Sequence, residues 1–74
     1  MFSVFPNPIT SGKVYINTEF NVEKQIQVFD ILGKQVMMQT LKGRELNVSS
    51  LRSGVYILKV MEDGKTATRK LIIN

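Results

Sequence analysis

Hydrophobic and polar residues alternate with a period of two in short segments along most of this chain. Such alternation is typical of β-strands with one buried face, because successive side chains point to opposite sides of the backbone. Glycine, asparagine, aspartate and serine interrupt the pattern at short intervals, as expected for tight turns. A helical period has almost no support. The chain is therefore predicted to be all-β.

The alternation predicts six strands that follow an opening segment. These strands cover residues 13–18, 24–31, 35–40, 46–48, 55–61 and 66–73. The opening segment, Phe5-Pro6-Asn7-Pro8, is expected to be an edge strand or an entry segment, because proline has no amide hydrogen to donate to a neighbouring strand. The segment 24–31 is expected to be a central strand, since both of its faces carry bulky apolar residues.

Three turns are predicted between these strands. Leu32-Gly33-Lys34 closes a hairpin, with Gly33 supplying a positive φ and Asp30 accepting hydrogen bonds from nearby amides. Lys42-Gly43-Arg44 is interpreted as the turn of a second hairpin, which leads into 46–48. Asp63-Gly64 predicts a type I′ turn between the last two strands.

About seven strands with turns at these spacings favour a small immunoglobulin-like antiparallel β-sandwich. Two facing sheets can share one apolar core, whereas a single small sheet would leave one face in water. The predicted core consists of Val14, Ile16, Ile26, Val28, Val36, Leu46, Tyr56, Leu58 and Val60.

The composition sets limits on function. A chain of 74 residues, 43% hydrophobic and 22% charged, has the size and apolar content of one globular domain. It contains no cysteine and no histidine, so it lacks disulfides, the common metal ligands and the usual nucleophile and base near neutral pH. We therefore expect no catalytic site, no metal site and no cofactor, and we do not expect an enzyme.

Charge and hydropathy argue against two kinds of partner. The net charge of +4 is moderate, and the phenylalanines lie far in sequence from the basic last strand, so no nucleic-acid surface is expected. The longest apolar run has four residues, against roughly 18 for a membrane helix, so no membrane insertion is expected. No export signal opens the chain. Residues 1–74 are interpreted as a single domain excised from a larger secreted protein, with Met1 an added start.

Five sequence blocks occur in order along nearly the whole chain. They are Phe5-Pro6-Asn7-Pro8, Asp30-Ile31-Leu32-Gly33-Lys34, Leu46-Asn47-Val48-Ser49-Ser50-Leu51, Gly54-Val55-Tyr56-Ile57-Leu58-Lys59-Val60 and Arg69-Lys70-Leu71-Ile72-Ile73. In sequence and spacing, these blocks resemble the C-terminal sorting domain of type IX secretion cargo, type A, also called the Por secretion system sorting domain. Asn74 departs from the pattern, because many such domains end on a basic residue.

The resemblance implies a sorting signal that follows its cargo domain in the same chain. Such a domain is recognised in the periplasm of a Gram-negative bacterium by the outer-membrane translocon and shuttle proteins of the type IX system. A sortase-like cell-surface protease commonly removes it, and the cargo is released or joined to lipopolysaccharide. The implied location is therefore the cell surface or the medium. A generic immunoglobulin-like accessory or adhesion module remains the alternative, because the strand pattern also allows it.

The last two strands carry the candidate residues for partner recognition. Lys59 interrupts an apolar strand and should lie on the solvated face, beside Lys70 or Arg69 according to register. This basic cluster either contacts a partner or consists of ordinary solvated side chains. The segment Leu71-Ile72-Ile73 can belong to the core, and it can also form an edge strand that adds to a partner's sheet.

Other candidate residues have structural interpretations. Pro6, Asn7 and Pro8 form either a rigid opening turn or, in the functional interpretation, the junction with the cargo. Gly54 opens the strongest strand. Tyr56 follows it and is expected to pack its ring in the core with its hydroxyl at the rim.

Overall fold

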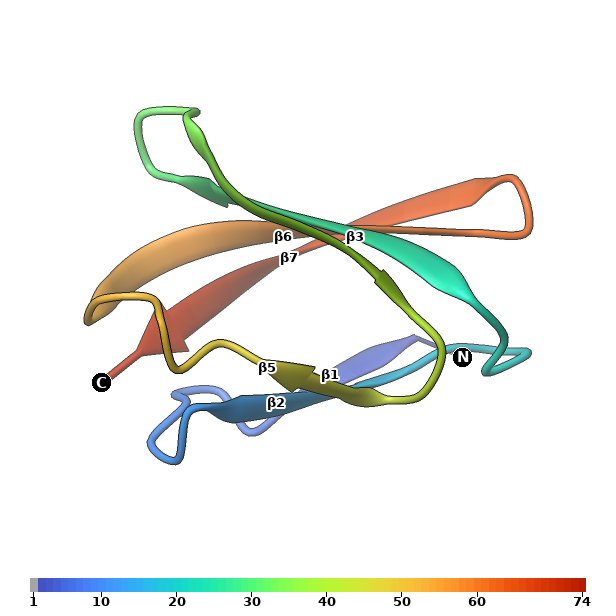
Figure 1. Cartoon of the computed structure of the whole chain (residues 1–74), viewed down its shortest axis with the longest axis horizontal. Coiled ribbons are helices and arrows are strands. Elements are labelled where there is room, and N and C mark those ends of the chain that lie inside the picture. The colour runs from blue at the N-terminus through green and yellow to red at the C-terminus, as the bar shows by residue number, and fades with distance from the viewer. Residues whose placement is uncertain (1) are drawn as a thin grey trace.

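The computed structural model describes residues 2–74 and shows two antiparallel sheets packed face to face (Figure 1). The smaller sheet has the order β1-β2-β5 and the larger one the order β4-β3-β6-β7. The strands are β1 (Ser3–Phe5), β2 (Lys13–Asn17), β3 (Lys24–Asp30), β4 (Gln35–Leu41), β5 (Glu45–Asn47), β6 (Gly54–Glu62) and β7 (Lys65–Ile73). The predicted seven-stranded sandwich is confirmed. The ends of six strands lie within one residue of the predicted ones, whereas the opening strand β1 ends at Phe5, before Pro6-Asn7-Pro8.

One predicted hairpin is wrong. The turn Lys42-Gly43-Arg44 does not join paired strands, because β4 and β5 belong to different sheets and the chain crosses between the two layers here (Figure 1). The crossover is bonded on both sides: the Arg44 carbonyl accepts from the Ile16 amide at 2.8 Å, and the Gly43 carbonyl accepts from Lys24 Nζ at 3.1 Å. Because these contacts join segments that are distant in the sequence, the local pattern of residues could not distinguish the crossover from a hairpin turn.

The core lies between the two sheets and contains all of the predicted residues except Val36. Five further residues are buried there that the alternation did not single out. These are Ile9, Leu41, Val48, Leu71 and Ile73. Ile9 and Val48 lie beyond the ends of three-residue strands, where a period-two pattern is too short to assign a side, and Leu41 is the last residue of β4.

Val36 points away from the core because the inward side of β4 consists of its odd-numbered residues. The register pairs Met37 with Val28 and Leu41 with Lys24, and both of these β3 residues are buried. Met37 therefore packs against the core, while Val36 is 36% exposed and Met38 66% exposed. A β-bulge follows, since Phe29 pairs with Gln35 and leaves Val36 as an extra residue on β4. Both phases of β4 carry apolar side chains, so the alternation alone did not identify its inward side.

The other two predicted turns do close hairpins. Asp63 and Gly64 have φ values of 53° and 76°, as a type I′ turn requires, and they join β6 to β7. In the other turn Gly33 has a φ of 87°, and Asp30 Oδ1 accepts from the amides of Leu32 and Lys34, each at 2.9 Å. The hairpins β3–β4 and β6–β7 are therefore fixed by local chemistry.

Candidate recognition surface

Asn7 binds the start of the domain to its C-terminal strand. The residue lies between Pro6 and Pro8, each preceded by a cis peptide bond, just after β1. Its Nδ2 donates to the Lys70 carbonyl at 2.8 Å, and its Oδ1 accepts from the Ile72 amide at 2.9 Å. The side-chain amide thus replaces a peptide group of a neighbouring strand. The predicted rigid turn has this additional role, which only the long-range pairing reveals.

Ile9 continues the pairing that Asn7 begins. Its amide donates to the Ile72 carbonyl at 2.7 Å, and its carbonyl accepts from the Asn74 amide at 2.9 Å. Ile9 and Ile73 thereby form a parallel β-bridge, and the Ile9 side chain is fully buried. The edge of β7 is therefore covered along its last residues.

The segment Leu71-Ile72-Ile73 contributes to the core, as one of the two interpretations expected. Leu71 and Ile73 are buried, and Ile72 is partly buried on the opposite face. The outward main-chain groups of Ile72 are already bonded to Asn7 and Ile9. Addition of this segment to a partner's sheet would first require the displacement of both residues.

The structure brings two of the three predicted basic residues to one face. The register of β6 and β7 pairs Lys59 with Thr68 and Ile57 with Lys70, so the two lysines are diagonal neighbours on the outer face of the larger sheet. Arg69 alternates to the opposite face, where its guanidinium carbon lies 4.5 Å from the centroid of the Phe2 ring. A recognition role of these residues remains a prediction.

Around the two lysines, the outer face of the larger sheet is largely apolar. Its exposed hydrophobic side chains include Val36, Met38, Val55 and Ile57, and the β3–β4 turn adds Ile31. The four strands place no carboxylate on this face, since the acidic residues Asp30 and Glu62 lie in the inward phase. Exposed apolar surface bordered by lysine is typical of protein contact sites. From the sequence alone, the only sign of this face is that apolar residues also occupy the strand positions that alternate away from the core.

Tyr56 packs within the core, as predicted, and Gly54 opens β6 at an exposed position. The Tyr56 ring is buried, and its hydroxyl donates to the Arg52 carbonyl at 2.8 Å, four residues upstream. A Cβ at Gly54 would lie 3.8 Å from that ring, and the φ of Gly54 is 156°. The pair positions the start of β6.

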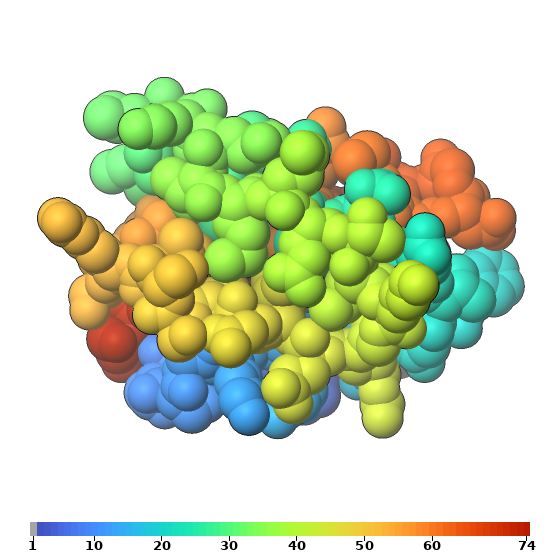
Figure 2. Space-filling model, in the orientation of Figure 1, coloured from blue at the N-terminus to red at the C-terminus, as the bar shows by residue number. Residues whose placement is uncertain are grey.

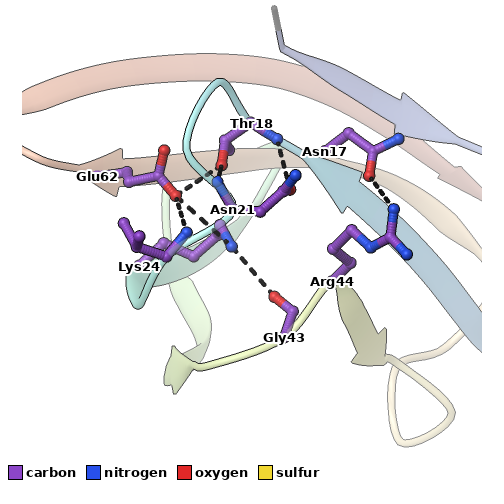
Figure 3. A network of polar contacts seen from close by, with 8 residues as sticks. Asn17, Thr18, Asn21, Lys24, Gly43, Arg44 and Glu62 are labelled. Atoms are coloured by element: carbon purple, nitrogen blue, oxygen red, sulfur yellow. Dashed lines mark hydrogen bonds and ion pairs between the residues drawn. The ribbon is translucent and has the colours of Figure 1, made fainter.

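A buried polar network, which the sequence analysis missed, ties the two sheets together (Figure 3). Glu62 Oε2 accepts from Thr18 Oγ1 at 2.6 Å and from the Val22 amide at 3.1 Å. Lys24 Nζ lies 3.7 Å from the same oxygen and donates to the Gly43 carbonyl. In the sequence, Lys24 and Glu62 each continue the alternation of inward-facing residues in their strands. This alternation was the one sign in the sequence that both charged side chains are buried.

The network keeps Glu62 ionised. Burial raises the pKa of the Glu62 carboxyl and is the largest single effect, because a charge loses its hydration. The hydrogen bonds from Thr18 and Val22, together with the charge of Lys24, outweigh it and lower the pKa below the ordinary value of 4.5. One oxygen of the carboxylate is thus held by three groups within the fold, which is typical of a structural role.

Two open grooves lie on the described part of the chain. One, of about 250 Å³, lies beside the β6–β7 turn and includes Phe2, Phe20 and Ala67. The other, of about 380 Å³, includes Tyr15 and Arg44. Ligand pockets commonly have volumes of about 300–1,000 Å³ and enclose most of the ligand. Within residues 2–74 no group of three acidic or other ligating side chains could hold a metal ion, and no helix could cross a membrane.

The comparisons with known proteins agree with the fold and with the sequence blocks. Among solved structures, the chain is similar to part of PorZ, described as an essential bacterial surface component of the type-IX secretion system of Porphyromonas gingivalis. The TM-score is 0.73 at 18% identity, over 99% of this chain and 11% of that one, so this likeness concerns the fold. No curated protein matches the chain. The family described as the secretion system C-terminal sorting domain matches residues 3–74, and the chain therefore belongs to this family.

Proposed function

We propose that this domain, as a type A member of the family, is the C-terminal sorting signal of a longer exported protein. The observation that carries the proposal is the family match over residues 3–74, which extends through every strand of the sandwich. As a member of this family, the chain is a type IX sorting signal. Domains of this family are generally non-catalytic. Residues 1–74 would then form the sorting domain, joined at its N-terminal side to a cargo domain.

The folded surface, and not a short linear segment, is the proposed recognition element. Asn7 bonds directly to Lys70 and Ile72, so the side of the domain next to the cargo and the C-terminal strand form one unit. A sorting signal built in this way is presented only when the domain is folded. The proposed readers are the outer-membrane translocon and shuttle proteins, and a sortase-like surface protease would then remove the domain.

The proposed route leads through the periplasm and across the outer membrane of a Gram-negative bacterium. The cargo would reach the cell surface or the medium, free or joined to lipopolysaccharide. The domain itself would act without catalysis, in keeping with a sequence that contains no histidine and no cysteine.

A reporter fusion tests this function. Residues 2–74 are joined to the C-terminus of a periplasmic reporter in cells with the type IX machinery, and the reporter is measured in the medium and on the surface. Secretion is expected, with retention in the periplasm in matched cells that lack the translocon. Retention in both strains, with the domain shown to be folded, would favour the alternative of an accessory module.

A shortened fusion locates the signal. Deletion of residues 70–74 should abolish sorting, because it removes the partners of Asn7 and the end of β7. The deletion also removes core residues, so the folding of the shortened domain is measured separately by circular dichroism. Normal secretion of the shortened fusion would exclude the C-terminal strand from recognition.

Charge reversal tests the two lysines of the outer face. Lys59→Glu combined with Lys70→Glu should weaken secretion if this pair is recognised. The matched control combines Lys13→Glu and Arg52→Glu, which changes the net charge equally on other parts of the surface. Equal secretion of both double variants would assign Lys59 and Lys70 to solubility.

A further inference from the structure

The two sheets have four edge strands, and they are protected unequally. β1 and β5 have three residues each, and short edges offer few main-chain groups to a partner. The end of β7 is covered by Asn7 and Ile9, and Arg69 donates to the Thr68 carbonyl at 2.9 Å. β4 is a seven-residue edge that pairs with β3 alone.

The register of the larger sheet identifies the main-chain groups that β4 leaves unpaired. In antiparallel sheets, successive residues direct their amide and carbonyl groups to alternate sides. The hydrogen bonds to the Asn7 side chain show that the main-chain groups of Lys70 and Ile72 point away from β6, toward the free edge of β7. The same alternation can be followed from β7 through β6 and β3 to β4 by means of the registers. It places the main-chain amide and carbonyl groups of Met38 and Thr40 at the open edge of β4.

β4 lacks the usual protection against strand addition. Its sequence, from Gln35 to Leu41, contains no charged residue, no proline and no glycine. Its bulge lies at the start of the strand, so the pairing from Met37 onward is regular. Figure 2 shows the yellow-green atoms of this part of the chain at the front of the molecule, with no other segment over them. Natural proteins rarely leave such an edge open without a use for it.

The charges beside β4 indicate the chemistry of its occupant. Lys34 precedes the strand, Lys42 follows it, and both are exposed. Neither takes part in an ion pair within residues 2–74. Antiparallel pairing of two copies about Met38 would set Lys34 of each copy opposite Lys42 of the other, which is repulsive. A strand with an acidic residue at each end would instead be attracted by both Lys34 and Lys42.

We propose that β4 accepts an extended segment of a partner protein as a fifth strand of the larger sheet, with carboxylates beside Lys34 and Lys42. The inference rests on the proposed function, because the partner would belong to the secretion machinery. At about 3.3 Å per residue, eight residue steps separate the lysines by roughly 26 Å. The segment therefore carries its acidic residues about seven to nine positions apart. Main-chain bonds to Met38 and Thr40 hold it.

Two matched proline variants of the reporter fusion test the proposal in cells. Thr40→Pro removes an outward amide from the open edge, and Thr68→Pro makes the same change on the edge of β7. We expect Thr40→Pro to lower secretion about tenfold and Thr68→Pro to leave it near the unchanged fusion. Equal secretion of both variants would overturn the inference and leave the sorting function intact, whereas failure of the unchanged fusion would refute the function itself.

A second variant decides the case in which Thr40→Pro does not fold. Lys34→Glu combined with Lys42→Glu leaves the main chain intact and repels an acidic strand. Loss of secretion by this folded variant supports the proposal, and normal secretion contradicts it.

A peptide measures the edge directly in the isolated domain. The probe is acetyl-Glu-Thr-Val-Thr-Val-Thr-Val-Thr-Glu-amide, with a control in which lysine replaces both glutamates. The acidic peptide should shift the amide resonances of Met38 and Thr40 at concentrations at least tenfold lower than the control. Equal shifts with both peptides would refute the charge assignment. Sedimentation that shows a dimer abolished by Thr40→Pro would identify a second copy as the occupant and overturn the proposal.

Discussion

Removal of the Asn7 side chain should loosen the C-terminal strand without disturbing the core. Asn7→Ala deletes the hydrogen bonds to the Lys70 carbonyl and the Ile72 amide, of 2.8 and 2.9 Å, and leaves the Ile9 pairing in place. Each such bond contributes about 0.5–1 kcal/mol net, so the two together contribute about 1–2 kcal/mol. In a domain of this size that corresponds to a Tm lower by roughly 5–15 °C.

Thermal denaturation followed by circular dichroism measures the loss, and amide hydrogen exchange locates it. The Ile72 amide should exchange faster in Asn7→Ala, because its acceptor is gone. Asn47→Ala is the matched control: Asn47, the last residue of β5, accepts through Oδ1 from the Ser49 amide at 2.9 Å and from the Ser49 hydroxyl at 2.6 Å, so its side chain bonds only locally. An unchanged Tm with unchanged exchange at Ile72 would refute the proposed role of Asn7.

Three further changes address the interior and the turns. Lys24→Met leaves the Glu62 carboxylate without its cation and should cost about 3 kcal/mol, measured by urea denaturation; a cost below about 1 kcal/mol would contradict the buried ion pair. Because the pKa of Glu62 is lowered in the fold, its contribution to stability is complete above the ordinary pKa of 4.5 and is lost as the pH falls through the folded value. Acid should therefore destabilise the unchanged protein more than Glu62→Gln, and parallel curves from pH 7 to 3 would argue against this linkage. Gly33→Ala should cost about 1 kcal/mol, since the φ of 87° is unfavourable for alanine, whereas Gly43→Ala has similar space and no positive φ and should have little effect.

The strand addition proposed for β4 also bears on behaviour in isolation. An open edge favours association between copies, and Lys34 and Lys42 oppose it by their charge. The same two residues therefore serve solubility in the free domain and selectivity in the complex.

The sequence by itself determined the elements that depend on local chemistry. Period-two alternation identified the strands and the inward side of most of them, and Gly33 and Asp63-Gly64 fixed two hairpins through their positive φ values. Tyr56 was placed in the core with its hydroxyl bonded at the rim. These features need only neighbouring residues, so they can be inferred from a single chain.

The tertiary structure decided everything that joins distant residues. It assigned β4 and β5 to different sheets, placed an extra residue at Val36, and separated Arg69 from Lys59. The pairing of Asn7 with Lys70 across 63 positions follows from how the layers meet. Which edge is covered and which stays open depends on the same packing, since main-chain groups are alike in every strand and only their neighbours distinguish them.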